Sequence, residues 1–368
     1  MCDLNRVQLG DLLDYEQPTR YIVSSTDYDD TYDTPVLTAG QTFILGYTNE
    51  TKGIYKASKS NPVIIFDDFV TSFYLVDFDF KVKSSALKIL KPKKDVNIYY
   101  VYYAMLGINF VPKEHARHWI SKYSLFEISY PSLAKQQEIV SHLDTFTTLI
   151  SNLESELDMR RKQYEHYRNQ LLDFEGVEGV EWKTLGDVCK FKYGYTAKAD
   201  DNGSYRYIRI TDIDEYGRLY KDNAKYIGEF DDLDGYVLKK NDIVVARTGA
   251  TFGKTLIFEA DYPAVYASFL IKIDFKGILL NKYYWHFAQS KLYWMQANKL
   301  VGGGAQPQFN TGALSQVIVP IPSLTKQAEI VSKLDAFENL IQSLDQEIKL
   351  RQKQYEYYRE KLLTFEKE

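Results

Sequence analysis

Residues 131–175 read PSLAKQQEIVSHLDTFTTLISNLESELDMRRKQYEHYRNQLLDFE, and residues 322–366 read PSLTKQAEIVSKLDAFENLIQSLDQEIKLRQKQYEYYREKLLTFE. The two segments align without a gap at an offset of 191 residues, and about 27 of their 45 positions are identical. A duplicated segment of this length indicates that the chain is built on an internal repeat.

Each copy carries one stripe of mostly apolar side chains, with an arginine at the same place in both. The steps alternate between four and three residues, which is the spacing of a coiled-coil seam. Neither copy contains Gly or an internal Pro, so the sequence predicts two long helices. The 36 residues from Ile139 to Phe174 would span about 54 Å at about 1.5 Å per residue. The stripes comprise Ile139, Leu143, Phe146, Ile150, Leu153, Leu157, Arg160, Tyr164, Tyr167, Leu171 and Phe174, and then Ile330, Leu334, Phe337, Ile341, Leu344, Ile348, Arg351, Tyr355, Tyr358, Leu362 and Phe365.

A long helix with a single seam needs a partner, and the nearest one is the other copy. One interpretation is a generic helical hairpin or an oligomerisation coil. The other is a spacer that fixes the distance between two globular units. The copies also agree on their surfaces, where Lys162 and Arg168 match Lys353 and Arg359. This agreement favours a function beyond seam packing and makes these four residues candidates for binding a partner protein.

The length and composition predict at least two domains in a cytoplasmic protein. The 368 residues have ordinary hydrophobic content, with no basic-then-apolar signal at the start and no apolar run that could span a membrane. The only cysteines, Cys2 and Cys189, predict ordinary reduced thiols and neither a disulfide framework nor a zinc site.

The net charge of −5 argues mildly against a simple nucleic-acid binder. The charge sums to −2 over residues 1–130, −3 over 131–175, +1 over 176–321 and −1 over 322–368. Any DNA-binding face would therefore be a local basic patch, or would be completed by a partner protein.

Two globular units, residues 1–130 and 176–321, lie outside the predicted helices. Short apolar runs between Gly, Pro and Asn predict β-strands in both units, together with one buried helix in each. Each unit ends in a short strand that leads into a long helix, and Gly176–Gly179 is a plausible hinge. The predicted strands are Tyr21–Val23, Phe43–Leu45, Val63–Phe66, Phe73–Val76, Leu87–Leu90, Leu125–Ile128, Tyr207–Ile210, Ile243–Ala246, Leu256–Phe258, Leu270–Ile273 and Val317–Pro320, and the predicted helices are Asn97–Leu106 and Lys282–Ala297.

The two units share a frame but little sequence. Each begins with Leu-Gly-Asp, at residues 9–11 and 185–187, and each has an Asn-turn before an apolar strand, at residues 61–66 and 241–246. The second match has an offset of 180, so Asp67 falls on Arg247 and Asp68 on Thr248. A duplicated scaffold with different chemistry at one strand end suits a protein that reads two different targets.

These features resemble the specificity subunit of Type I restriction-modification systems, the HsdS family. The resemblance covers essentially the whole chain and rests on the paired PSLxKQxEIVxxLDxF helices, the Leu-Gly-Asp starts and the run Gly303–Asn310 (GGAQPQFN). Lys113–Trp119 (KEHARHW) occupies that last slot in the first unit. The resemblance implies an α+β fold with two similar α/β target recognition domains, separated by two long antiparallel coiled-coil helices in a pseudo-twofold repeat. The implied domains are 1–130 and 176–321, with a central spacer helix at 131–175 and a C-terminal one at 322–368.

The resemblance also implies a partition of function between subunits. Each recognition domain would read one half of a split site in double-stranded DNA. The helices would set the spacing and dock two adenine methyltransferase subunits, which restriction subunits would join where the system has them. This chain would bind no cofactor, because S-adenosylmethionine, ATP and Mg would belong to the partner subunits. The rival interpretation is a structural coiled-coil adaptor that does not recognise DNA sequence.

The apparent catalytic motifs fail on spacing or context. Residues 248–255 (TGATFGKT) resemble a P-loop, but Thr248 stands where the first Gly should be, and the following residues predict a strand where a P-loop opens a helix. His115 and His118 lack a credible third metal ligand. We therefore expect neither catalytic nor metal-binding residues in this chain.

In the second unit, residues 247–254 predict a DNA-facing loop, with a plain surface turn as the alternative. Arg247 could fork onto guanine O6 and N7, Thr248 lies beside it, and Lys254 could meet a phosphate. The turn at residues 192–196 combines Lys192, Tyr193, Tyr195 and Thr196 as further DNA-binding candidates, although its tyrosines could equally be core. Gln306 and Gln308 carry amides that can read adenine, although the intervening proline suits a structural turn just as well.

In the first unit, Asp67 and Asp68 could accept hydrogen bonds from cytosine N4, or could order basic neighbours. Arg117 is a candidate for phosphate contact. Lys81 and Lys83 complete the DNA-binding candidates.

Overall fold

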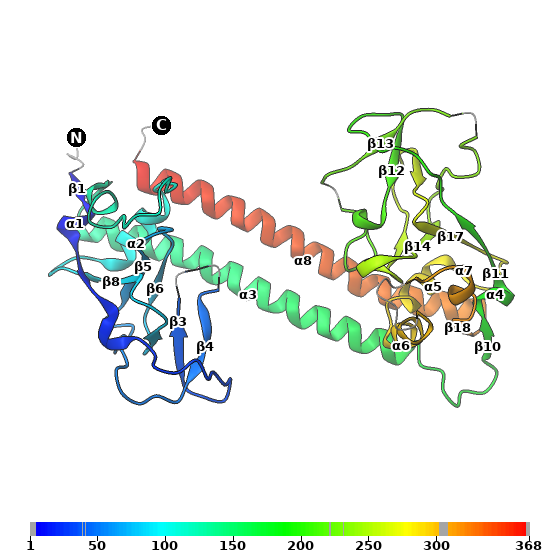
Figure 1. Ribbon diagram of the computed structural model, residues 1–368, viewed down its shortest axis with the longest axis horizontal. Coiled ribbons are helices and arrows are strands. Elements are labelled where there is room, and N and C mark those ends of the chain that lie inside the picture. The colour runs from blue at the N-terminus through cyan, green and yellow to red at the C-terminus, as the bar shows by residue number, and fades with distance from the viewer. Residues whose placement is uncertain are drawn as a thin grey trace. The chain divides into compact units, whose positions relative to one another are not determined.

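The computed structural model describes residues 5–38, 40, 42–220, 222–230, 232–301 and 308–365 (Figure 1). Packing divides the chain into two compact units. Unit 1 comprises Met1–Leu153 and Glu347–Glu368, and unit 2 comprises Glu154–Gln346. Each unit therefore contains one globular part together with a portion of both long helices.

The globular part of unit 1 contains three small sheets. The largest has the strand order β2-β8-β5-β6, and all of its neighbours are antiparallel. A second sheet has the order β4-β3-β7, in which β3 and β7 are parallel, and β1 pairs with β9. The strands are β1 (Arg6–Gln8), β2 (Leu13–Glu16), β3 (Thr34–Leu37), β4 (Ile44–Thr48), β5 (Val63–Asp67), β6 (Phe73–Val76), β7 (Lys81–Val82), β8 (Leu87–Pro92) and β9 (Glu127–Ser129); the helices are α1 (Leu9–Leu12), α2 (Ile98–Leu106) and the 3₁₀ turns η1 (Pro18–Tyr21) and η2 (Tyr123–Leu125).

Unit 2 repeats this topology strand for strand. Its four-stranded sheet has the order β11-β17-β14-β15, its three-stranded sheet the order β13-β12-β16 with β12 and β16 parallel, and β10 pairs with β18. The strands are β10 (Glu181–Thr184), β11 (Cys189–Tyr193), β12 (Tyr205–Ile208), β13 (Tyr226–Ile227), β14 (Ile243–Ala246), β15 (Thr255–Ile257), β16 (Ala264–Tyr266), β17 (Leu270–Phe275) and β18 (Ile318–Ile321); the helices are α4 (Leu185–Val188), α5 (Asn281–Phe287), α6 (Lys291–Leu300), α7 (Thr311–Leu314) and the 3₁₀ turns η3 (Ile210–Asp212) and η4 (Gly249–Thr251).

The Leu-Gly-Asp motifs form the short helices α1 and α4, which explains why both units share them. Leu9 and Leu185 are fully buried. A Cβ atom added at Gly10 would lie 3.2 Å from the Ser124 carbonyl oxygen, and one added at Gly186 would lie 3.2 Å from the Ser315 Cβ. Glycine at these positions allows α1 and α4 each to lie close to the segment that leads into the next long helix.

The long helices are α3 (Leu133–Leu171) and α8 (Leu324–Thr364), as the repeat predicts. In unit 1 the N-terminal part of α3 packs on the C-terminal part of α8, where the Phe146 and Tyr358 rings stack with centroids 5.4 Å apart. In unit 2 the C-terminal part of α3 packs on the N-terminal part of α8, where Tyr167 stacks on Phe337 at 5.3 Å. The helices are therefore antiparallel, which confirms the predicted fold class.

The seam arginines are held along their own helices. The Arg160 Nη1 lies 3.1 Å from the Gln163 Oε1, and the Arg351 Nη1 lies 2.9 Å from the Gln354 Oε1. Each guanidinium also pairs with a glutamate four residues earlier. This repeated arrangement satisfies each cation along its own helix.

Most predicted strands match the structure to within two residues at each end, but one strand and one helix were predicted wrongly. Tyr21–Val23 is not a strand, because Pro18 starts the 3₁₀ turn η1 and only Ile22 forms an isolated bridge. The strand predicted at Tyr207–Ile210 begins two residues earlier and ends at Ile208, since Ile210 starts η3. The helix predicted at Lys282–Ala297 is broken into α5 and α6, because the Ser290 hydroxyl accepts from the Tyr293 N–H and caps a new helix.

Two further findings bear on the sequence predictions. None of the helices in the described ranges is long and apolar enough to cross a membrane. Cys189 is a buried free thiol whose Sγ contacts the Leu185 carbonyl oxygen at 2.8 Å, and burial raises its pKa to about 12.

Candidate nucleic-acid interface

Strands β11, β17 and β14 are neighbours in the four-stranded sheet of unit 2 (Figure 1). Aromatic and basic side chains lie at one end of these three strands. In the register, Tyr193 lies opposite Ile271, and Ile271 lies opposite Val245. Side chains alternate between the two faces of a strand, so Phe269 and Arg247, each two residues further along, extend from the same face as Tyr193. The sheet therefore places Tyr193, Phe269 and Arg247 together.

The Arg247 guanidinium lies over both of these aromatic rings. The guanidinium carbon is 5.0 Å from the Tyr193 ring centroid and 5.3 Å from that of Phe269. Its Nε is buried and has no hydrogen-bond partner. The two rings remain 40% and 51% exposed, so this aromatic clamp (Tyr193, Arg247 and Phe269) opens to solvent.

No acidic group in the described part of the chain forms an ion pair with Arg247. The other arginines of the globular part of unit 2 have hydrogen-bonded or ion-paired partners. Their partners are Tyr262 and Tyr220 for Arg206, Asp212 for Arg209, and Glu259 and Glu338 for Arg218. The Nε of Arg206 and of Arg218, like that of Arg247, is buried without a hydrogen-bond partner. Arg247 differs from these arginines in lying over two aromatic rings.

The Tyr193 hydroxyl fixes one wall of the clamp. It lies 3.1 Å from the Thr311 Oγ1 and accepts from the Thr311 N–H at 3.3 Å. Burial raises the pKa of Tyr193, but its hydrogen bonds with Thr311 and the nearby Arg247 charge outweigh that effect and lower the pKa below its usual value.

The residues that follow β14 are hydrogen-bonded to the segment before α7. The Gln308 Nε2 donates to the Thr248 Oγ1 at 3.1 Å, and the Phe309 N–H donates to the Arg247 carbonyl at 2.7 Å. Thr248 is only 8% exposed, so its hydroxyl holds Gln308 in place instead of facing a ligand. Gln306 lies outside the described residues.

The loop at residues 248–255 is a turn between strands and does not have the context of a P-loop. It forms the 3₁₀ turn η4 and leads into strand β15 at Thr255, as the sequence predicts. Lys254 closes the turn through its backbone, since the Ala246 N–H donates to its carbonyl at 2.9 Å. Its side chain is half-buried, and phosphate contact stays a prediction.

The turn at residues 192–196 uses most of its polar groups within the fold. The Lys192 Nζ donates to the Gly235 carbonyl at 2.8 Å and lies 3.9 Å from the Tyr236 ring centroid. The Tyr195 hydroxyl donates to Asp232 at 3.0 Å. Thr196 is exposed. Tyr193 is thus the residue of this turn that the structure brings to Arg247.

In unit 1, Asp68 contradicts the prediction of a base-contacting carboxylate. It is 2% exposed, its Oδ2 lies 3.1 Å from the buried Lys88 Nζ, and its Oδ1 accepts from the Trp119 N–H at 2.8 Å. Burial and pairing remove Asp68 from the candidate set. Asp67 is half-buried, and its Oδ1 accepts from the N–H groups of Phe69 and Val70, so it shapes the turn after β5.

Lys81 is the second residue of unit 1 at which a predicted DNA contact was wrong. It is 2% exposed, and its Nζ lies 2.9 Å from the Glu50 Oε2 and donates to the Lys52 carbonyl at 2.7 Å. A buried, paired ammonium cannot also contact DNA. Lys83 and Arg117 are exposed, Lys83 beside the Tyr28 ring, and both stay predictions.

The four predicted partner-binding residues lie on the long helices. Lys162 is exposed and pairs with Asp158 at 2.7 Å, and Lys353 is exposed. The Arg168 and Arg359 guanidiniums lie over the equivalent rings of Tyr164 and Tyr355, at 5.1 and 5.5 Å. Each arginine therefore makes the same packing contact on its own helix, whereas the lysines are the more accessible cations.

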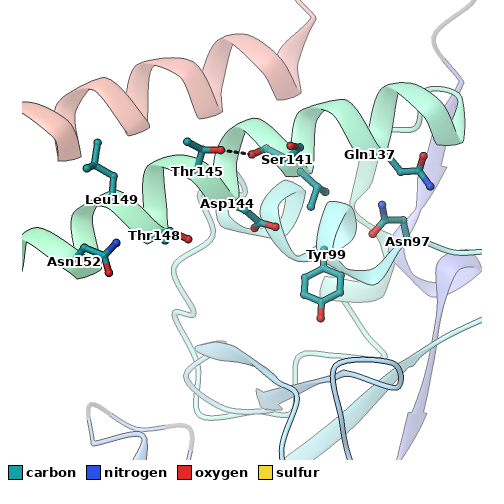
Figure 2. Close-up of a pocket in the computed structure, with 10 residues that line it drawn as sticks. Asn97, Tyr99, Gln137, Ser141, Asp144, Thr145, Thr148, Leu149 and Asn152 are labelled. Atoms are coloured by element: carbon teal, nitrogen blue, oxygen red, sulfur yellow. Dashed lines mark hydrogen bonds between the residues drawn. The ribbon is translucent and has the colours of Figure 1, made fainter.

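A groove of about 660 Å³ lies in unit 1, between the start of α2 and the polar face of α3 (Figure 2). Amide and hydroxyl groups, including those of Asn97, Gln137 and Thr148, line it. The one carboxylate in the lining, Asp144, accepts from the Tyr103 hydroxyl at 2.6 Å. The groove therefore lacks the basic lining that DNA would require.

Phe269 and Thr311 are the residues of the clamp region that sequence reasoning missed. Phe269 stands immediately before the apolar strand β17, where an exposed aromatic side chain could have been recognised as out of place. Thr311 has no comparable signal, because its contact with Tyr193 spans 118 residues. Within the described residues, no group of three or more His, Cys, Asp or Glu side chains could hold a metal ion.

Comparison with known proteins identifies the family. The model of the Type I restriction modification DNA specificity domain matches residues 1–159 and 177–350. The chain belongs to this family. It is 42% identical to the EcoR124I/EcoR124II specificity subunit of Escherichia coli, over 98% of this chain and 94% of that one. It is 30% identical to a putative type I restriction enzyme specificity subunit of Haemophilus influenzae, over 88% of this chain and 86% of that one.

Solved structures of the family share the fold of this specificity-family chain. The crystal structure of the Type-I restriction-modification system S subunit from M. genitalium has a TM-score of 0.65 at 14% identity, covering 99% of this chain and 97% of that one. A structure from work on complex assembly and conformational transition of the type I R-M system has a TM-score of 0.56 at 14% identity, covering 98% of each chain.

Proposed function

We propose that this chain is the DNA-sequence-recognition subunit of a Type I restriction-modification complex. The globular part of unit 1 reads one half of a bipartite site, and that of unit 2 reads the other half. The observation that carries the proposal is the identical topology of the two parts with unlike chemistry at the equivalent strand end, where Asp67 corresponds to Arg247. A shared scaffold gives both parts one mode of approach to DNA, and the divergent side chains give each part its own sequence.

In this proposal the chain is non-catalytic and acts through its partners. Helices α3 and α8 space the two readers and dock two adenine methyltransferase subunits, with restriction subunits joining where the system encodes them. S-adenosylmethionine supplies the methyl group on the methyltransferase subunits, and ATP and Mg serve the restriction subunits. The exposed Lys162 and Lys353, at equivalent places on the two helices, support two equivalent docking faces.

Single-molecule methylation mapping tests the proposal. Cells that lack other methyltransferases would express this chain with the methyltransferase subunit encoded beside it. We expect adenine methylation in one bipartite motif, with two specified segments separated by a gap of fixed length. An absence of methylation by an assembled complex, or methylation independent of sequence, would contradict the proposal and favour a coiled-coil adaptor.

A further inference from the structure

We propose that the aromatic clamp of unit 2 is a guanine-reading site, in which Arg247 donates to guanine O6 and N7 in the major groove. The inference rests on the proposed function and adds the identity of one base. Tyr193 and Phe269 act as positioning residues, because their rings hold the guanidinium.

The first argument is that the clamp keeps a cation ready for a ligand. Guanidinium groups stack on aromatic faces and keep a planar fork of donors. Here the stacking on two rings replaces the carboxylates that satisfy Arg209 and Arg218. A half-buried cation without an ion-pair partner among the described residues gains from an external acceptor, because the fold has already removed part of its hydration.

The second argument separates a base from a phosphate. Both units must contact the DNA backbone, so a phosphate ligand should recur at equivalent positions. The register places Asp67 of unit 1 at the position of Arg247, and Leu87 and Glu16 at those of Phe269 and Tyr193. Unit 1 therefore has a carboxylate in place of the guanidinium and no aromatic ring at the other two positions. The clamp is thus not part of the scaffold that the two units share. A feature found in one reader and not in the other is expected to carry specificity.

The third argument concerns the geometry of the acceptor. Guanine presents two acceptors side by side, O6 and N7, and a bidentate arginine contact matches them. Thr311 fixes the position of the Tyr193 ring. The Arg247 N–H donates to the Phe269 carbonyl at 3.0 Å, so hydrogen bonds fix both aromatic residues and the arginine backbone. A guanidinium positioned in this way loses little freedom on binding a planar partner.

The test pairs a protein change with a change in the base. The complex of this chain with its methyltransferase subunit would bind duplexes of its mapped motif, with each guanine replaced in turn by 7-deazaguanine, which lacks the N7 acceptor. For the wild-type chain we expect about tenfold weaker binding at one position. Arg247→Ala should weaken binding to the unmodified duplex by about 5-fold to 150-fold and show no further loss with 7-deazaguanine at that position.

Two variants serve as controls. Lys240 is an exposed cation that precedes the N-terminal end of β14, whereas Arg247 follows the C-terminal end. The Lys240→Ala complex should keep the full 7-deazaguanine effect. Arg247→Lys keeps the charge but lacks the planar fork, and its binding should discriminate among the four bases at that position less than wild type does.

The outcomes distinguish this inference from the proposed function. A wild-type complex that methylates no bipartite motif overturns the proposed function. A bipartite motif without a guanine that is sensitive to 7-deazaguanine overturns the guanine-reading site alone, even if Arg247→Ala fails to fold. Equal 7-deazaguanine effects in the wild type and Arg247→Ala also overturn it.

Discussion

At the scale of single residues, Asp68 is a structural carboxylate of unit 1. Asp68 and Lys88 are each 2% exposed as side chains, and Lys88 also lies 4.5 Å from the Tyr15 ring centroid. Breaking a buried pair by removing one member is costly because the other charge stays buried and unpaired. The pair therefore links the residue after β5 to β8, next to the strand end at which the two units carry different side chains.

Asp68→Ala should destabilise unit 1 by about 3–5 kcal/mol, measured by urea denaturation. Replacing both members with uncharged residues, as in Asp68→Asn with Lys88→Met, should cost much less, because no charge remains and the Asn side-chain oxygen can still accept from the Trp119 N–H. Lys56→Ala, which breaks the exposed pair with Asp79, should cost less than about 1 kcal/mol. A loss for Asp68→Ala as small as that for Lys56→Ala would show that the buried pair is not needed for stability.

His286 joins the globular part of unit 2 to both long helices. It is fully buried in unit 2, with its Nε2 3.0 Å from the Asp335 Oδ1 and its Nδ1 2.9 Å from the Tyr164 hydroxyl. Asp144, at the equivalent place on α3, instead accepts from the Tyr103 hydroxyl in unit 1. Burial lowers the pKa of His286, although the hydrogen bond to Asp335 partly opposes that shift.

The lowered pKa of His286 predicts a pH dependence of the stability of unit 2. Below about pH 6.5 an unfolded histidine binds a proton that the folded His286 does not, so the free energy of unfolding falls as the pH decreases. The stability from this group is complete above about pH 6.5 and is lost towards the lower pKa of the folded state, by at most about 1.4 kcal/mol per pH unit. Thermal unfolding at pH 7.5 and 5.5 should show a smaller difference for His286→Gln than for the wild type. Equal differences would mean that another group causes the pH dependence.

At the scale of elements, the buried glutamine in the first turn of each long helix makes different contacts in the two units. The Gln327 Nε2 donates to the Pro322 and Ile278 carbonyls, both at 2.9 Å, and its Oε1 accepts from the Leu280 N–H at 2.8 Å. The equivalent Gln136 donates to the Pro131 carbonyl at 2.9 Å, and its Oε1 has no partner. The repeated residue thus joins α8 to the segment before α5 but closes only a local turn at α3.

Gln327→Ala should destabilise the protein more than Gln136→Ala does, because it leaves more buried backbone groups without partners. Each such group costs about 1–3 kcal/mol. Urea denaturation of the two variants provides the comparison, and each serves as the control for the other. An equal loss would show that the Leu280 and Ile278 contacts add nothing to the stability of unit 2.

At the scale of the whole molecule, α3 and α8 each run from one unit into the other. Their division between the units falls after Leu153 in α3 and after Gln346 in α8. An insertion at both places keeps the contacts within each unit, and seven residues restore the direction of the seam to within about 20°.

Inserting one heptad at both places should lengthen the gap between the half-sites. Seven helical residues add about 10.5 Å, or about three base pairs at about 3.4 Å each. Methylation mapping should show the same two half-sites with the longer gap. A heptad in α3 alone would put the paired seams out of register and is expected to prevent assembly. An unchanged gap in the doubly extended chain would rule out the helices as the spacer.

The repeat, the two long helices, their seam and the family could all be predicted from the linear sequence. These features depend on periodicity and on contacts close in sequence, which a linear pattern records. The sequence also placed β5 and β14 correctly and matched Asp67 with Arg247, because the Asn-turn and apolar strand are local signals.

Which candidate residues are accessible to a ligand depends on the three-dimensional packing of the chain. Asp68 and Lys81 look like surface charges in the sequence, but pairing with Lys88 and Glu50 buries them. Arg247 gains its clamp from three strands that are distant in the chain but adjacent in the sheet. Burial and side-chain pairing are non-local properties, because they depend on register between strands and not on the identity of neighbouring residues.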